Sequence, residues 1–331
     1  MTQLSKPSGF PDPKSGKPVI EINQGPGEIN WLESTFYFFT WGFALASAGV
    51  LFWICLIVYK DAQPAISEYG LSFIFSREWN VGNLVFGALP FVYGTLVTSA
   101  LALLLAVPMG LAVAIVTSED FLPPWVRSPI AFLIELIAAI PSVIVGLWGI
   151  FVFVPFLLPF QNALFKYLGG IPLFSTEPFG FGMLSAGMVL SIMILPTMAA
   201  ISRDVLTAVP PDLRSASMSL GATRWETICL ILLPTAGSGI LGAAILSLGR
   251  ALGETMAVTM VIGNSIQISP SLLAPGYTIP AVLANQFAEA LDKLHVGSLM
   301  YLALVLFAIT LIVNATATVF VQLISKKAIG R

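Results

Sequence analysis

Six long apolar segments, each about long enough to cross a lipid bilayer, dominate this sequence of 331 residues. A spanning helix needs about 20 consecutive and mostly apolar residues. Proline inside such a segment does not argue against a helix, because neighbouring helices in a membrane satisfy the freed backbone carbonyls. The predicted spans are approximately 37–59, 89–116, 130–154, 183–201, 236–262 and 299–324. The sequence therefore predicts an all-α integral membrane protein.

Composition supports the bilayer as the solvent of this chain. Hydrophobic residues make up 57% of the sequence and charged residues only 10%, whereas soluble domains carry roughly a quarter charged residues. The net charge of -2 gives no reason to expect a nucleic-acid partner. Two cysteines and one histidine predict neither a disulfide framework nor a metal or catalytic site. We expect a polar cytoplasmic tail over 1–34 and one transmembrane domain over 35–326.

The distribution of lysine and arginine predicts how the chain is oriented. Basic residues are enriched in the cytoplasmic loops of membrane proteins. With both termini inside, only Lys60, Arg77, Lys166 and Lys293 fall in outside loops, and Arg250 falls within a span. All other basic residues then lie in cytoplasmic segments. The sequence therefore predicts a multi-pass protein with both termini in the cytoplasm.

The cytoplasmic segment 203–234, between the fourth and fifth spans, is predicted to form two short helices. Pro211 is typical of a first helical turn, and Gly221 is typical of the position just after a helix ends. Thr223 and Glu226 have the spacing of a capping box, which opens a second helix. This pattern fits either a well-capped connector or a compact element that docks on a partner.

Three ionisable residues lie within predicted spans, namely Glu135 in the third and Arg250 and Glu254 in the fifth. Each costs about 2.5–3.5 kcal/mol at mid-membrane, so each is expected to face protein or water. Arg250 and Glu254 are four residues apart, which places them on one face of the predicted helix. One interpretation is a buried ion pair that joins helices. The other is a translocation path in which the planar fork of Arg250 binds an oxyanion, with Glu254 or Glu135 neutralising it between transport events.

The cytoplasmic segment resembles the EAA loop of ATP-binding-cassette importer permeases. That loop reads Glu-Ala-Ala, then Gly, then Ile-x-Leu-Pro, and the positions in register here are Ala216, Gly221, Ile231, Leu233 and Pro234. Ser215 and Ser217 stand where the family has Glu and the second Ala. The resemblance implies that the segment inserts into a cleft on a separate ATPase subunit. Because the Glu is missing, one salt bridge to the ATPase subunit is not expected, whereas the docking itself still is.

The ATPase is expected on another chain. A phosphate-binding P-loop reads G-x-x-x-x-G-K-[ST], and the Gly-Lys pair here, Gly16 and Lys17, is followed by proline. We therefore expect no cofactor in this chain, with ATP and Mg bound by the partner ATPase.

Further stretches resemble the permeases of phosphate-specific importers, above all their C-type subunit. They are 86–99, 138–149, 248–258 (LGRALGETMAV) and 281–289, and the likeness covers about 70–325. The resemblance implies a type I, MetI-like permease of the bacterial inner membrane. Its expected partners are a homologous permease, two ATP-binding subunits and an extracytoplasmic phosphate-binding protein. A permease for another oxyanion, such as sulfate or molybdate, and an ion-coupled secondary transporter or channel remain as alternatives.

Overall fold

The computed structural model describes residues 31–329, and within them the chain is helical without a strand. The long helices are α1 (Trp31–Tyr69), α3 (Leu89–Ser118), α7 (Met183–Thr207), α10 (Leu233–Gly253) and α13 (Lys293–Ile329). The shorter ones are α2 (Ser72–Phe75), α4 (Pro124–Ala138), α5 (Ser142–Trp148), α6 (Val154–Leu168), α8 (Pro211–Ser219), α9 (Arg224–Thr227), α11 (Met256–Val261) and α12 (Ile279–Gln286). The predicted all-α fold is confirmed.

Six helical segments of the described chain are long and apolar enough to cross a membrane. They are Thr35–Tyr69, Leu89–Ser118, Ser142–Leu168, Met183–Thr207, Arg224–Gly253 and Lys293–Val319. The first is apolar on every side, which is typical of a helix surrounded by lipid. The chain divides into two units within α1, after Ile54.

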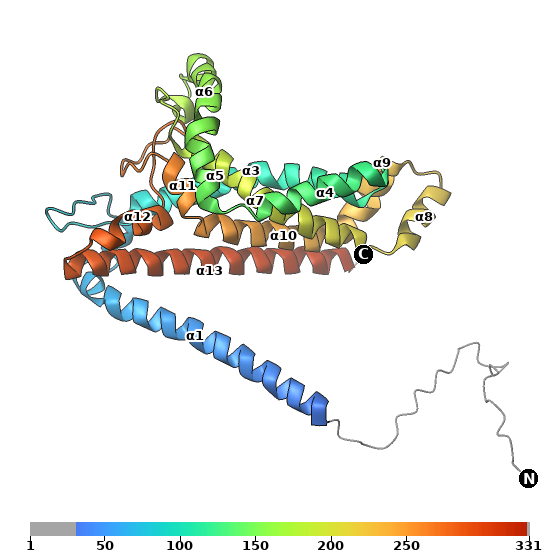
Figure 1. Cartoon of the computed structure of the whole chain (residues 1–331), viewed down its shortest axis with the longest axis horizontal. Helices are drawn as coiled ribbons and strands as arrows, with labels where there is room; N and C mark the ends of the chain where they lie inside the picture. The colour runs from blue at the N-terminus through green and yellow to red at the C-terminus, as the bar shows by residue number, and fades with distance from the viewer. Residues whose placement is uncertain (1–30, 330–331) are drawn as a thin grey trace, which may run out of the picture. The chain divides into compact units, whose positions relative to one another are not determined.

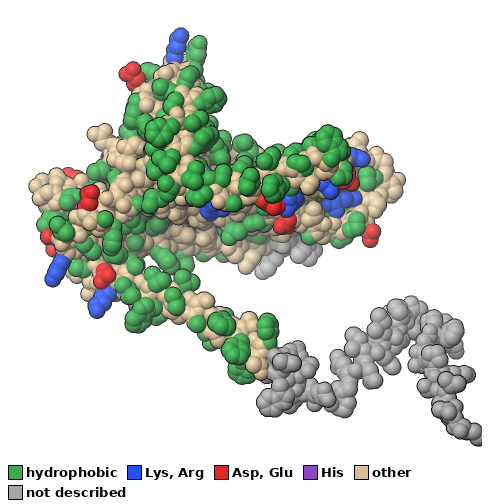
Figure 2. Space-filling view, in the orientation of Figure 1, with side chains coloured by type: hydrophobic (Ala, Val, Ile, Leu, Met, Phe, Trp, Pro, Cys, Tyr) green, Lys and Arg blue, Asp and Glu red, His purple; other side chains and the backbone are tan. Residues whose placement is uncertain are grey.

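The second unit is a bundle in which α3 packs against α7, and α10 packs against both α7 and α13. The two ends of the bundle differ, since α8 and α9 lie at one end and α11 and α12 at the other (Figure 1). Acidic and basic side chains gather over the end that carries α8 and α9 (Figure 2). Glycine permits the closest approach at the opposite end, where a Cβ on Gly94 of α3 would lie 2.1 Å from the Tyr277 carbonyl oxygen.

The predicted third span, 130–154, is wrong as a single helix. The chain leaves the helical conformation at Pro141, whose ψ is 140°, so that α4 ends at Ala138 and α5 begins at Ser142. Proline has no N–H to donate and disfavours helix at the residue before it. The continuous apolar helix runs instead from α5 through the π-helical segment Gly149–Phe153 into α6. The span therefore lies at Ser142–Leu168.

The predicted fifth span, 236–262, is also wrong at both ends. It starts earlier, because α9 continues through the π-helical segment Ile228–Leu232 directly into α10. It ends earlier, because Glu254 has an extended backbone with ψ of 126° and α11 begins only at Met256. Gly253 marks the break, since glycine is about 1 kcal/mol less favourable than alanine inside a helix.

Candidate functional site

Helix α8, the first of the two helices predicted for 203–234, begins and ends as its sequence predicts. Pro211 occupies the first turn. After α8, Gly221 has a φ of +89°, a conformation that glycine adopts at little cost. The Gly221 N–H donates to the Met218 carbonyl over 3.0 Å, and the Ala222 N–H donates to the Ser217 carbonyl over 3.2 Å. These bonds satisfy carbonyls at the end of α8 and turn the chain sharply towards α9.

The predicted capping box opens α9. The Glu226 N–H donates to Thr223 Oγ1 over 3.3 Å, and the Thr223 N–H donates to Glu226 Oε2 over 2.7 Å. The expectation of a second separate short helix is wrong, because α9 is the first turn of the fifth span. Pro234 therefore lies inside a continuous helix. The π-helical turn before it, closed by the Leu233 N–H on the Ile228 carbonyl, precedes the position where proline cannot donate.

The residues at the EAA-like positions divide between an exposed side and an attached side of α8. Ser215 and Ala216 are exposed, and the Ser215 hydroxyl donates to the Pro211 carbonyl within its own helix. Ser217 faces inward, where its Oγ lies 3.0 Å from Thr227 Oγ1 and joins α8 to α9. Because Ser217 stands where the family has its second alanine, it adds a polar contact between α8 and α9.

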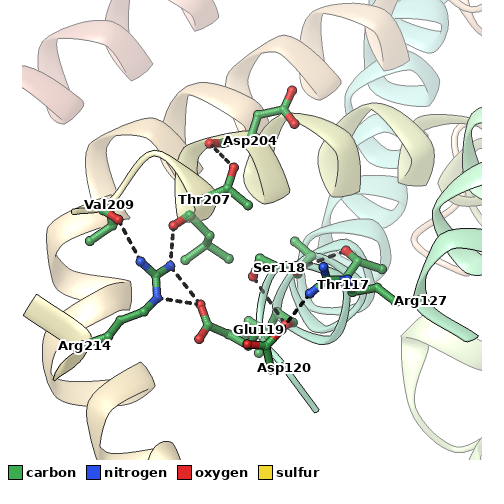
Figure 3. A network of polar contacts seen from close by, with 12 residues as sticks. Thr117, Ser118, Glu119, Asp120, Arg127, Asp204, Thr207, Val209 and Arg214 are labelled. Carbon is green, nitrogen blue, oxygen red and sulfur yellow. Dashed lines mark hydrogen bonds and ion pairs between the residues drawn. The ribbon is translucent and has the colours of Figure 1, made fainter. Parts of the chain in front are cut away.

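Arg214 holds the middle of a polar network that the sequence analysis missed (Figure 3). Its Nη2 and Nε donate to Glu119 Oε1 over 2.9 and 3.2 Å. Its Nη1 donates to the Val209 carbonyl over 2.7 Å, and Nη2 also donates to the Leu206 carbonyl over 2.8 Å. The sequence analysis used Arg214 only as a cytoplasmic charge. Two features of the sequence could have indicated this pair: Arg214 directly precedes the EAA-like run, and Glu119 lies just after the second span.

Glu119 belongs to a short turn after α3 that contacts both α8 and α9. In this turn the Asp120 carbonyl accepts from Arg224 Nη1 over 2.7 Å, and the rings of Phe121 and Trp225 lie 5.4 Å apart. The Asp120 carboxylate also pairs with Arg127 over 3.0 Å at an exposed position. The end of α3 is therefore bound to α8 through Arg214 and to α9 through Arg224.

The three predicted intramembrane charges do not come together. Arg250 is exposed near the end of α10, and its Nη1 donates to Thr197 Oγ1 on α7 over 3.1 Å. Glu254 lies beyond the helix end, so the two residues do not share a helical face as expected. Glu135 on α4 pairs instead with Arg203 on α7, with Oε1 and Nη2 3.2 Å apart. No acidic side chain in the described part of the chain forms an ion pair with Arg250.

Arg250 lines an open groove of about 600 Å³. Its polar side chains come from three helices, with Thr197 on α7, Arg250 on α10, and Asn314 and Thr318 on α13. Buried Asn314 Oδ1 has no hydrogen-bond partner among the described residues. The remaining lining is apolar apart from two glycines, so the groove presents one cation and several hydrogen-bonding groups to whatever occupies it.

Two further features of the described residues concern metal ligands and cysteines. Within 31–329, no group of three or more His, Cys, Asp or Glu side chains is arranged to hold a metal ion. Cys55 and Cys229 are free thiols.

Comparison with known proteins places this arrangement in a family. The family model of the binding-protein-dependent transport system inner membrane component matches residues 106–329. The phosphate transport system permease protein PstC of Mesorhizobium japonicum is 44% identical over 269 residues, which cover 80% of this chain and 82% of that protein. The PstC of Pasteurella multocida is 41% identical over 305 residues, which cover 91% and 93%. This chain belongs to the PstC family of binding-protein-dependent permeases. The resemblance to phosphate-importer permeases is confirmed.

Solved structures support the fold of the PstC family member described here. A chain of the methionine ABC transporter MetNI, in an inward-facing conformation, matches with a TM-score of 0.53 at 16% identity, covering 71% of this chain and 96% of that one. A chain of the bacterial alginate ABC transporter matches with a TM-score of 0.53, also at 16% identity, covering 87% and 95%. Together with the family match, these likenesses confirm the expected architecture of an importer permease. The six apolar helices and the family indicate a multi-pass inner membrane protein.

Proposed function

We propose that this chain is the PstC-type permease subunit of an ATP-driven phosphate importer, where it forms part of the translocation path. The observation that carries the proposal is the identity of 41% or more, over most of the chain, to relatives described as phosphate transport permeases. The helical bundle, its cytoplasmic helices and the groove at Arg250 supply the parts that such a subunit needs.

The cytoplasmic helices supply a surface for an ATP-binding partner. Large apolar side chains stand exposed on or next to α8 and α9, where Leu220 is 89% and Trp225 61% exposed, and Met218 is exposed beside them. Exposed apolar residues gathered on a compact element are typical of a protein–protein contact. We assign this surface to one of two ATP-binding subunits, which bind ATP and Mg and drive α8 when they close. This chain itself performs no bond chemistry.

The groove at Arg250 is the proposed phosphate contact. Arginine donates paired, charge-assisted hydrogen bonds that suit a tetrahedral oxyanion. Thr197 and Thr318 add hydroxyl groups to the same groove. Glu254, at the break after α10 where the backbone is extended, is the proposed counter-charge when no anion is bound. Glu135 is not assigned to the path, because it already forms an ion pair with Arg203.

The other partners follow from the open form of the groove and from the family. A groove open along one side needs a second chain to close a path across the membrane, and a homologous permease of the PstA type meets that need. An extracytoplasmic phosphate-binding protein of the PstS type delivers the ion at the end opposite α8. Both termini are then cytoplasmic, and ATP-driven movement of α8 alternates access to the path.

ATP-dependent phosphate uptake into proteoliposomes that contain the whole complex tests the assignment. We expect uptake to need ATP and to be unaffected by excess sulfate. Arg250→Ala should reduce uptake about ten- to a hundredfold, because a hydrogen bond to a charged group contributes about 1.5–3 kcal/mol. Arg127→Ala, which removes only an exposed pair, is the matched control and should leave uptake unchanged.

Two outcomes would change the assignment. Equal inhibition by sulfate would make the chain a permease for oxyanions in general. Normal uptake by an assembled Arg250→Ala complex would make that arginine a structural link between α10 and α7.

A further inference from the structure

Side-chain hydrogen bonds join helix α8 to the rest of the bundle at two positions. None of its nine residues is buried. Two side chains on the described helix reach neighbouring elements, namely Ser217, through one hydroxyl contact to Thr227, and Arg214, through four donated hydrogen bonds. A helix without a buried face cannot transmit force by packing alone. Its connection to the membrane helices therefore depends on these few bonds.

The two attachments differ in strength and in target. The Ser217 contact is between neutral hydroxyls, whereas Arg214 makes charge-assisted bonds, which are roughly twice as strong. The pair of Arg214 and Glu119 is also mostly withdrawn from water, with side chains 20% and 17% exposed. Ser217 reaches only α9, the next element in the chain. Arg214 reaches the ends of both α3 and α7, which are distant spans in sequence.

The contacts of Arg214 with α7 lie at the end where a helix needs a cation. The last carbonyls of a helix have no partner within it and carry partial negative charge. Arg214 supplies such a cation, because it donates to the carbonyl of Leu206 in the last turn of α7 and to that of Val209 just beyond the helix. Further along the same helix, Thr197 accepts from Arg250 in the groove. One helix thus joins the Arg214 cluster to the proposed phosphate contact.

We propose that Arg214 is the positioning residue that couples movement of α8 to α3 and α7, and so to the groove at Arg250. The proposal rests on the proposed docking of α8 on an ATPase subunit. When that subunit displaces α8, the guanidinium carries the ends of both spans with it, because its bonds to Glu119 and to the α7 carbonyls hold all three elements together. Without the guanidinium, α8 moves while the spans lag behind.

The test is the number of phosphate ions imported per ATP hydrolysed, measured in proteoliposomes of the whole complex with wild type and Arg214→Met. Coupling between two sites in proteins typically changes an affinity by a factor of about 5 to 150. We expect the ratio of phosphate imported to ATP hydrolysed to fall by a factor at the lower end of that range, at least about fivefold. ATP hydrolysis and co-purification of the subunits should persist. Arg127→Met, in an exposed pair next to the same turn, is the matched control and should keep the wild-type ratio.

Arg214→Lys and Glu119→Gln keep the test decisive if Arg214→Met does not assemble. Lysine keeps the charge but not the fork that meets three acceptors, and glutamine keeps one acceptor without its charge. Both should assemble with ratios between those of wild type and a fully uncoupled complex. A wild-type ratio in both variants, or hydrolysis and uptake falling together in Arg214→Met, would overturn the proposal and leave Arg214 a structural residue.

A cross-link separates failure of this inference from failure of the proposed function. Leu220→Cys places a thiol on the most exposed part of the cytoplasmic surface, and a cysteine-directed cross-linker should join it to the ATP-binding subunit. Absence of that product, in a complex that still transports phosphate, would show that α8 does not dock on the ATP-binding subunit. A cross-link together with an unchanged ratio in Arg214→Met would remove only the role of Arg214.

Discussion

The end of the bundle that carries α8 and α9 and the groove at Arg250 both contain arginines, yet they are built in opposite ways. Arg214 is mostly buried and donates to three acceptors at or just beyond the ends of two other helices. Arg250 is exposed and donates to one neutral hydroxyl. A saturated guanidinium fixes the elements around it, whereas a guanidinium with free donors can take up and release an anion. The difference fits the two proposed roles, in which Arg214 fixes the geometry of the helices and Arg250 exchanges an anion.

If the end of the bundle that carries α8 and α9 is the rigid region, Glu119→Ala should have the largest effect on stability. Removal of the carboxylate leaves Arg214 half-satisfied in a mostly buried place, which costs about 1.5–3 kcal/mol. Asp120→Ala is the matched control, because its carboxylate is 89% exposed and its pair with Arg127 is superficial. Thermal unfolding of the purified complex in detergent measures both. Equal melting temperatures in the two variants would contradict the contrast between the regions.

Gly221→Ala should have the next largest effect. No atom lies within 4 Å of the position where the new Cβ would be, so the cost comes only from the φ of +89°. A left-handed backbone at a residue with a Cβ costs about 1–2 kcal/mol. Gly237→Ala is the matched control, since that glycine is in α10 with equally open space and alanine is favoured inside a helix. The melting temperature should fall in the first variant and hold or rise in the second.

Thr197→Val should have the smallest effect on stability, because it removes a single exposed hydrogen bond from the groove. We expect a loss below about 1 kcal/mol, the usual net value of such a bond. Phosphate uptake should nevertheless fall, since the hydroxyl that orients Arg250 is lost, and Thr197→Ser should restore it. A melting temperature lowered as much as in Glu119→Ala would show that Arg250 is a structural residue like Arg214.

The accuracy of sequence reasoning in this protein follows the range of the interactions involved. The end of α8 at Gly221 and the capping box of Thr223 and Glu226 were predictable, because all the bonding atoms lie within a few residues of one another. The break at Pro141 carried the same kind of local signal, but the apolar pattern running through it favoured one continuous helix. The π-helical turn before Pro234 similarly joins α9 to the fifth span where two helices were expected.

The partners of the charged side chains were not predictable, for a different reason. Glu135 could pair with any cation that the folded chain brings near it, and the sequence suggested Arg250 because both residues lie within predicted spans. The structure pairs it with Arg203, 68 positions away along the chain. Glu119 and Arg214 are 95 positions apart. Such pairs depend on how whole helices are placed beside one another, and a sequence pattern within one helix carries no record of that placement.

The sequence by itself determined the solvent, the number of spans, the caps of the cytoplasmic helices and the family of the permease. These follow from transfer of apolar residues into lipid and from backbone bonds between near neighbours. Only the tertiary structure decided where the third and fifth spans begin and end, which acid meets which arginine, and that Arg214 rather than Ser215 attaches the cytoplasmic helix. The physical reason is that the packing of α3 against α7 brings together charges that lie far apart in the sequence.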